Sequence, residues 1–210
     1  MLESEDIAGY TWTDAHLNCA HNYTLPHVLE IINTKLQQGG DRQVFDLGCG
    51  NGAVMALLRD HGYQVMGVDS STDGIKQAKV AYPDLKVEHG SAYDDLAGQY
   101  GTFPIVLSLD VVEHCFFPRK YAHTLYSLVQ AGGMALVSTP YHGYWKNLAL
   151  ALGGAMDRHF TALWDYGHVK FWSMQTLRVL LQEAGFSSVE FRRVGRIPAL
   201  AKSMIAIALN

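Results

Sequence analysis

The chain has 210 residues and a net charge of −4, and 49% of its residues are apolar while 17% are charged. This composition is typical of a single globular domain spanning 1–210 and excludes disorder, and the lack of a broad basic field argues against a nucleic-acid partner. Three scattered cysteines are too few for a disulfide framework, so we expect a cytoplasmic protein, and no apolar run approaches the roughly 20 residues that span a bilayer.

Short apolar runs alternate with helical patterns along the first two thirds of the chain. A first helix is expected with Pro26 in its first turn and Gly39-Gly40 at its end. Strands are then expected at residues 43–47, 64–68, 85–89, 103–109 and 134–138, with helices at 53–61, at 72–82 and from Pro118 to Gly132-Gly133. This alternation predicts stacked βαβ units and therefore an α/β fold with a mainly parallel sheet.

The last part of the chain departs from this alternation. A helix is expected from the N-cap Ser173 to Ala184, with Gly185 as its terminator. Residues 188–194 and 203–209 then form two strands with no helix between them, which predicts an antiparallel pair at one edge of the sheet. Nothing in the sequence indicates an oligomeric state.

Two segments lie outside the alternation, residues 1–24 and residues 140–172, and together they hold all four tryptophans. Long irregular stretches in compact domains are usually functional, and their aromatic content argues against disorder. We therefore predict that both form a lid over the strand ends, the alternative being an ordinary packed insertion. The candidates for binding a substrate there are Trp12, Tyr23, Tyr141, Trp145 and Trp164.

A glycine-rich loop, Asp46-Leu47-Gly48-Cys49-Gly50-Asn51-Gly52, joins the first strand to the next helix. Glycines there permit a tight turn and a close approach of a ligand to the backbone. Gly48, Gly50 and Ala53 also satisfy the relaxed dinucleotide fingerprint, which keeps an NAD-type oxidoreductase open as an alternative.

Two acidic residues favour a different ligand. The carboxylate of Asp46 would repel a pyrophosphate but attract an ammonium group, and Asp69 ends the second strand where a carboxylate can accept both ribose hydroxyls. S-adenosylmethionine has an ammonium, a sulfonium and no phosphate. The two acids therefore predict S-adenosylmethionine as the ligand.

From Gln43 to about Phe191 the chain resembles class I S-adenosylmethionine-dependent methyltransferases, in the group that includes the ubiquinone-biosynthesis O-methyltransferases. The matching segments are Asp46 to Gly52, Val68-Asp69-Ser70-Ser71, Gly90-Ser91-Ala92-Tyr93-Asp94 and Leu109-Asp110-Val111-Val112-Glu113-His114. Two positions depart from the family pattern: Ser91 replaces an Asp or Asn, and Ala131-Gly132-Gly133 replaces Pro-Gly-Gly.

The resemblance implies a Rossmann-like sheet of seven strands, mostly parallel with the last strand antiparallel, with helices on both faces and the cofactor at the carboxyl ends of the strands. It implies these cofactor-binding residues: Asp46, Gly48, Cys49, Gly50, Asn51, Gly52, Asp69, Ser70, Ser91, Ala92, Asp110 and Val111.

Methyl transfer is an in-line displacement, so the enzyme mainly positions the acceptor and excludes water. A hydroxyl acceptor also benefits from a base, and the candidates are His142, His168 and His114. We predict O-methylation of a small molecule. An N-methyltransferase acting on a small amine and a non-catalytic S-adenosylmethionine-binding protein remain alternatives.

No group of potential ligands has the spacing of a zinc site, so we expect no metal. The short apolar stretch Lys146–Leu152 could make a weak membrane contact, although packing inside the lid is the simpler interpretation.

Overall fold

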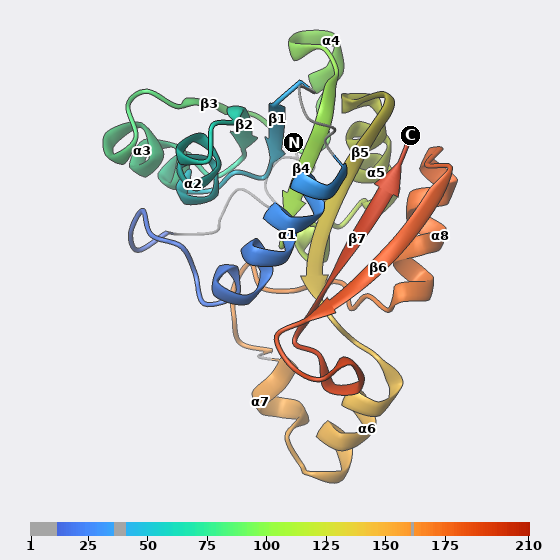
Figure 1. The fold of residues 1–210 in the computed structure, drawn as a ribbon. Helices are drawn as coiled ribbons and strands as arrows, with labels where there is room; N and C mark the ends of the chain where they lie inside the picture. The colour runs from blue at the N-terminus through green and yellow to red at the C-terminus, as the bar shows by residue number, and fades with distance from the viewer. Residues whose placement is uncertain (1–11, 36–40, 161) are drawn as a thin grey trace.

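The protein, a computed structural model, is described over residues 12–35, 41–160 and 162–210, which form a sheet flanked by helices (Figure 1). The sheet has seven strands in the order β3-β2-β1-β4-β5-β7-β6. They are β1 (Gln43–Leu47), β2 (Gln64–Asp69), β3 (Lys86–His89), β4 (Phe103–Leu109), β5 (Val129–Pro140), β6 (Ser188–Val194) and β7 (Ser203–Leu209). Strands β1 to β5 pair in parallel, whereas β7 is antiparallel to both β5 and β6, as predicted.

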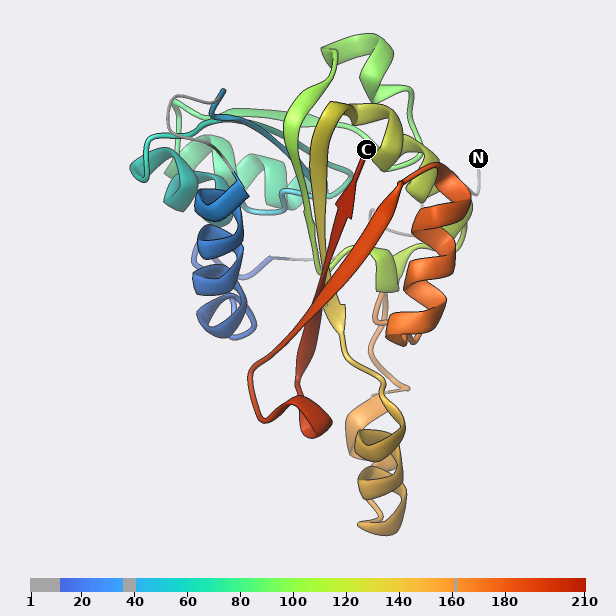
Figure 2. The same cartoon turned by 45° about the vertical axis from the view of Figure 1, so that its right-hand side comes forward.

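Helices cover both faces of this sheet (Figure 2). On one face lie α1 (His21–Lys35), α2 (Ala53–Asp60) and α3 (Thr72–Ala81); on the other lie α5 (Pro118–Leu128) and α8 (Met174–Ala184). Val28 of α1 and Leu58 of α2 belong to one buried cluster, while Leu125 of α5 and Leu181 of α8 belong to another. Full burial of such a side chain contributes roughly 1.5–3 kcal/mol, so the two clusters hold the helices on the sheet.

The strand order places a ligand crevice between β1 and β4. The chain runs outward from β1 to β2 and β3, then returns across the sheet to β4 and continues outward in the opposite direction to β5. Ligands of open parallel sheets bind at the carboxyl ends of the strands, where the order reverses in this way. The glycine loop follows β1 and the segment 110–114 follows β4, so both lie at this point.

Helix α1 begins earlier than the sequence predicts. Its start is fixed by Asn18, whose side-chain oxygen accepts hydrogen bonds from the backbone N–H groups of Ala20 and His21. Pro26 therefore lies inside the helix and not in its first turn. At this interior position, proline removes one intrahelical hydrogen bond. Pro26 is exposed, so water can satisfy the carbonyl that loses its partner. The predicted end at Gly39-Gly40 lies outside the described residues.

Most other boundaries agree with the prediction to within two residues, with two larger differences. Strand β5 begins at Val129 and not at Met134, so Gly132-Gly133 lies within the strand, and the short helix α4 (Leu96–Tyr100) was not predicted. The pairing of β4 with β5 shifts register between Phe103 and Ile105, which accommodates the longer strand.

The sequence predicts that the segment 140–172 is irregular, but part of it is helical. It contains α6 (Tyr144–Leu152) and α7 (Met156–Phe160), which project beyond the carboxyl ends of β4 and β5 (Figures 1 and 2). No residue of α6 or α7 is fully buried, but Lys146 and Leu150 are half-buried and line the cavity, so the packing of Lys146–Leu152 inside a lid stays a prediction. Two short 3-10 turns, η1 (Val112–His114) and η2 (Pro198–Leu200), lie nearby in the fold, and η2 contacts α6. Within the described ranges, no helix has the length and apolar character needed to cross a membrane.

Candidate active site

A cavity of about 630 Å³ opens at the carboxyl ends of the strands. Residues from the glycine loop, β2, the segment after β4 and the N-terminal segment line one end, and α6, α7 and the loop that carries η2 line the other. This volume is within the range of ligand-binding pockets. The cavity therefore joins the two regions that the sequence assigns to cofactor and substrate.

The glycine loop requires glycine at two of its positions. Gly48, Gly50 and Gly52 all have positive φ angles, of 89°, 52° and 78°. A Cβ atom at Gly48 would lie 2.3 Å from the side chain of Val111, and one at Gly50 would lie 2.1 Å from the ring of Trp12. The loop is therefore packed directly against the segment after β4 on one side and the N-terminal segment on the other.

The N–H groups of this loop are already bound within the protein. Those of Gly48 and Cys49 donate to the carbonyl of Val68, at 2.8 and 3.0 Å, and that of Gly50 donates to Asp69 Oδ2 at 2.8 Å. A pyrophosphate binds a glycine loop through such N–H groups. Their internal use argues against a dinucleotide here.

Asp69 is held rigidly at the end of β2. Its second oxygen accepts a hydrogen bond from the backbone N–H of Ser71 at 2.7 Å, so each carboxylate oxygen has one internal donor. A carboxylate oxygen can accept more than one hydrogen bond, so both oxygens retain the capacity to accept a ribose hydroxyl.

The cofactor end of the cavity is acidic. Burial, and then the charge of Asp69, raise the pKa of Asp46 to about 7, and burial also raises the pKa values of Asp69 and Asp110. Carboxylates that are desolvated and lie close to one another are stabilised by a positively charged ligand. An ammonium or sulfonium group suits this end, whereas a phosphate does not.

Asp110 adopts an uncommon backbone conformation directly after β4. Its φ angle is 57°, and its Oδ1 accepts a hydrogen bond from Ser138 Oγ at 2.8 Å. Non-glycine residues in this region are strained and are found most often at functional sites. The strain turns the chain sharply into η1, which brings Glu113 and His114 to the cavity wall.

The N-terminal segment is fastened onto the glycine loop. The side-chain amide of Asn51 donates to the carbonyls of Asp14 and His16, at 2.8 and 3.0 Å, and Tyr82 Oη donates to the carbonyl of Ala15. The ring of Trp12 packs against Gly50 and lines the cavity. Trp12 is thus placed at the cofactor end and not among the lid aromatics.

The three candidate histidine bases all line the cavity, but their environments differ. Burial lowers the pKa values of His142 and His168 to about 4, with nearby cationic and histidine side chains as smaller causes. The ring of His142 stacks on Phe160 at 5.7 Å. Both rings are neutral at pH 7, and a pKa near 4 makes a weak general base.

His114 is the last residue of η1, in the segment that follows β4. Its Nδ1 donates to the carbonyls of Tyr166 and Gly167, at 3.0 and 3.2 Å, so Nε2 is the unprotonated nitrogen of the neutral ring. Burial lowers its pKa, although these two carbonyls act in the opposite direction.

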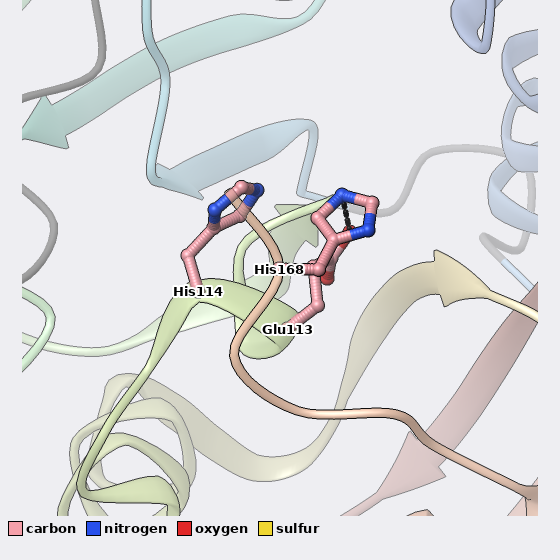
Figure 3. Close-up of side chains that lie close together, drawn as sticks. All are labelled: Glu113, His114 and His168. Carbon is pink, nitrogen blue, oxygen red and sulfur yellow. Dashed lines mark ion pairs between the residues drawn. The ribbon is translucent and has the colours of Figure 1, made fainter. Parts of the chain in front are cut away.

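Glu113, His114 and His168 form a cluster in the cavity wall (Figure 3). One potential ligand atom from each lies within 4.8 Å of the others, and His168 Nε2 lies 4.0 Å from Glu113 Oε1. The Glu113 side chain is 1% exposed, and neither of its oxygens has a hydrogen-bond partner at normal distance and angle, although the hydroxyl of Thr139 lies near enough to favour the charged form. Burial, and then the charge of Asp110, raise its pKa well above the usual value.

The segment 140–172 supplies His168 to this cluster, and backbone hydrogen bonds hold that part of the segment in place. The carbonyl of Glu113 accepts hydrogen bonds from the N–H groups of Val169 and Lys170, at 2.9 and 3.0 Å, which fixes the end of the segment beside η1. The sequence analysis missed Glu113 as a site residue. Its signal was its position in the segment Leu109 to His114, but its pairing with a histidine far along the chain depends on the fold.

The other predicted site residues divide into two groups. Those that line the cavity are Asp46, Gly48, Cys49, Asn51, Asp69, Ser70, Ala92, Asp110, Val111, Trp12, Tyr23 and Trp164. Those outside its lining are Gly50, Gly52, Ser91, Tyr141 and Trp145.

The structure shows the local surroundings of three residues outside the lining. Ser91 Oγ accepts a hydrogen bond from the N–H of Tyr93, which fixes the turn after β3. Tyr141 is buried, and Trp145 is 64% exposed and packs edge-on against Tyr144. Sequence reasoning could not separate these aromatics from those of the cavity, because all lie in the same segment.

Known proteins with sequences similar to this chain are methyltransferases. A family described as methyltransferase domain matches residues 22–190. The chain is 34% identical over 117 residues to the ubiquinone biosynthesis O-methyltransferase of Caulobacter sp. (strain K31), covering 54% of this chain and 46% of that protein. It is 26% identical over 152 residues to that of Ruegeria sp. (strain TM1040), covering 70% and 61%. The chain thus spans about half the length of the curated relatives it matches.

Solved structures show the same fold. The methyltransferase domain of bacterial CtHen1-CN has a TM-score of 0.66 and 19% identity, covering 92% of this chain and all of that one. An S-adenosylmethionine dependent methyltransferase from Mesorhizobium loti has a TM-score of 0.63 and 18% identity, covering 86% and 96%. Magnesium protoporphyrin IX methyltransferase from Synechocystis PCC 6803, solved with bound SAH, has a TM-score of 0.63 and 19% identity, covering 89% and 80%.

The fold, the glycine loop and these relatives define the predicted class, the class I S-adenosylmethionine-dependent methyltransferases. With residues 22–190 matched, the chain belongs to the methyltransferase domain family. This class also confirms the predicted cofactor, S-adenosylmethionine.

Proposed function

We propose that the whole protein transfers the methyl group of S-adenosylmethionine to a hydroxyl oxygen of a small aromatic acceptor. The observation that carries this proposal is the continuity of one cavity between an acidic cofactor end and a lid lined by aromatic and histidine side chains. The names of the ubiquinone biosynthesis O-methyltransferases among the relatives support oxygen as the methylated atom.

The proposed cofactor site uses the acidic end of the cavity. Asp46 faces the ammonium group and Asp69 accepts the ribose hydroxyls, while Ala92 borders the adenine and Asp110 with Val111 borders the methionine portion. During transfer the acceptor oxygen bonds to the methyl carbon as the carbon–sulfur bond breaks, the sulfonium becomes a neutral thioether, and the hydroxyl releases its proton. The protein excludes water and aligns the two reacting atoms.

Removal of the hydroxyl proton can be assisted in two ways. A histidine base is the first, and the candidates are His114, where two backbone carbonyls oppose the lowering of the pKa by burial, and His142, whose pKa is about 4. A divalent cation is the second. Glu113, His114 and His168 would hold it, and it would lower the pKa of the acceptor hydroxyl.

The buried carboxyl of Glu113 favours the cation. A buried carboxyl without a hydrogen-bond partner is destabilising, and a bound cation removes this penalty. The expectation of no metal came from spacing along the chain, which does not reveal ligands from η1 and the lid. A cytoplasmic location and a weak membrane contact through α6 stay predictions.

A screen of acceptors tests the proposed function. Phenols, catechols, carboxylates and amines would each be incubated with the full chain and S-adenosylmethionine, with release of S-adenosylhomocysteine as the readout. We expect turnover with an aromatic hydroxyl, and lower turnover after treatment with EDTA that added Zn²⁺ or Fe²⁺, the ions suited to two imidazoles and a carboxylate, restores. Turnover with amines alone would contradict O-methylation, and full turnover in EDTA would leave the histidine base as the remaining route.

A further inference from the structure

The cavity has two ends of opposite charge. Its cofactor end contains Asp46, Asp69 and Asp110, whereas its lid end contains Lys146 of α6 and, on the connection between β6 and β7, Arg196 and Lys202. The cofactor accounts for the acidic end. Nothing in the proposed cofactor site uses the basic end.

Lys146 is built into the lid end and does not extend into solvent. It is partly buried, and its Nζ donates to the carbonyl of Tyr141 at 2.7 Å and to that of Lys202 at 3.4 Å. An ammonium group has three donors, so these two contacts leave one for a ligand. Burial, and then the charge of Arg196, lower the pKa of Lys146 to about 8, so both side chains are cationic at pH 7.

The described part of the chain provides no carboxylate counter-ion for Lys146 or Arg196. Across residues 12–35, 41–160 and 162–210, neither Lys146 nor Arg196 forms an ion pair with a carboxylate. The titratable neighbours are His142 and His159, whose pKa values Lys146 helps to lower. Lys202 is engaged differently, because its Nζ lies 5.1 Å from the ring centre of Tyr23. Lys146 and Arg196 line the same cavity and repel one another, so a negatively charged ligand between them would stabilise this end.

We propose that the methyl acceptor carries a carboxylate, which binds between Lys146 and Arg196 while the acceptor hydroxyl faces the cluster of Glu113, His114 and His168. This inference rests on the proposed function and names the substrate class of the same cavity. The aromatic side chains between the two ends, Phe171 and Trp164, suit a flat ring that joins the carboxylate to the hydroxyl.

A matched pair of probes tests the proposal. The full chain would methylate catechol and 3,4-dihydroxybenzoate, which differ only by the carboxylate, with release of S-adenosylhomocysteine as the readout. We expect a KM at least tenfold lower for 3,4-dihydroxybenzoate. Lys146→Met and Arg196→Met should each raise this KM at least fivefold and leave the KM for catechol unchanged. Lys76→Met, an exposed lysine of α3 away from the cavity, serves as the control and should change neither.

Equal KM values for the two probes, or equal effects of Lys146→Met on both, would overturn the proposal. Lys146→Arg keeps the charge and should retain the preference, which separates charge from a structural role in α6. If Lys146→Met does not fold, the exposed Arg196 provides the independent test.

A binding measurement separates failure of this inference from failure of the proposed function. Calorimetry with 3,4-dihydroxybenzoate and the S-adenosylhomocysteine complex requires no turnover, and binding that Arg196→Met weakens would support the carboxylate site even if neither probe is methylated. Binding of phosphatidylglycerol vesicles that Lys146→Met abolishes, without any binding of the benzoate, would assign the basic end to lipid headgroups and overturn the proposal.

Discussion

The cofactor end and the lid end of the cavity are built in different ways. At the cofactor end, the glycine loop and Asp69 lie at the ends of adjacent strands, and their mutual hydrogen bonds follow from the parallel pairing of β1 with β2. At the lid end, α6, α7 and η2 come from separate parts of the chain and bury few side chains. The scaffold therefore holds the cofactor end rigidly, whereas the proposed acceptor end is built from a segment with few buried contacts.

The largest effect is expected at the cofactor end. Asp69→Ala removes the carboxylate proposed to accept both ribose hydroxyls and also releases the N–H groups of Gly50 and Ser71. Hydrogen bonds to a charged group contribute about 1.5–3 kcal/mol each, so the affinity for S-adenosylhomocysteine should fall at least about a hundredfold. Calorimetry measures this loss. An unchanged affinity would mean that the ribose binds elsewhere.

A somewhat smaller effect is expected where the two ends meet. Glu113→Gln keeps the size of the side chain but removes the carboxyl group proposed to hold the cation, so the turnover number should fall roughly 10- to 100-fold, the range for losing a group that holds or orients a metal. The affinity for S-adenosylhomocysteine should stay the same. A parallel loss of cofactor affinity would indicate that Glu113 supports the fold of the site and not the reaction.

The pH dependence of cofactor binding tests the acidic end further. In the free protein the pKa of Asp46 is about 7, and an ammonium group favours its ionised form. Binding should therefore release a proton below pH 7, so affinity for S-adenosylhomocysteine should rise by up to about tenfold per pH unit toward pH 7 and level off above it. Calorimetry from pH 5.5 to 8.5 would show the slope. Asp46→Asn should remove it, and a slope that persists in this variant would assign the proton to another group.

The smallest effects should distinguish two tryptophans that sequence reasoning treated alike. Trp12 packs on Gly50, so Trp12→Ala should weaken cofactor binding about three- to tenfold through lost contact and added water. Trp145 is 64% exposed on α6, and Trp145→Ala should leave cofactor binding unchanged. Equal losses in the two variants would show that the N-terminal segment has no special relation to the glycine loop.

Much of the fold could be predicted because it depends on local patterns. The alternation of apolar runs and glycine turns fixed the boundaries of β1, β4, β6 and β7 closely, and the lack of a helix between β6 and β7 revealed the antiparallel pair. Pro26 misled the prediction of α1, because the cap at Asn18 outweighed the preference of proline for a first turn.

The site was predictable only in its cofactor half. Asp46 and Asp69 stand out in sequence because strand ends and glycines mark them. The cluster of Glu113, His114 and His168, and the approach of Lys146 to Arg196, arise from segments that are far apart along the chain. Burial also changed the interpretation of the histidines, because it lowers the pKa of His168 to about 4, which residue type alone does not reveal.

The most direct test of O-methylation is to locate the transferred methyl group. The full chain would react with an aromatic diol and S-adenosylmethionine labelled at its methyl carbon, and mass spectrometry with NMR would identify the labelled position. The continuous cavity and the cluster of Glu113, His114 and His168 in its wall predict the label on an aromatic oxygen, with one S-adenosylhomocysteine formed per methyl transferred. A label on ring carbon, or transfer only to amines under the same conditions, would contradict it.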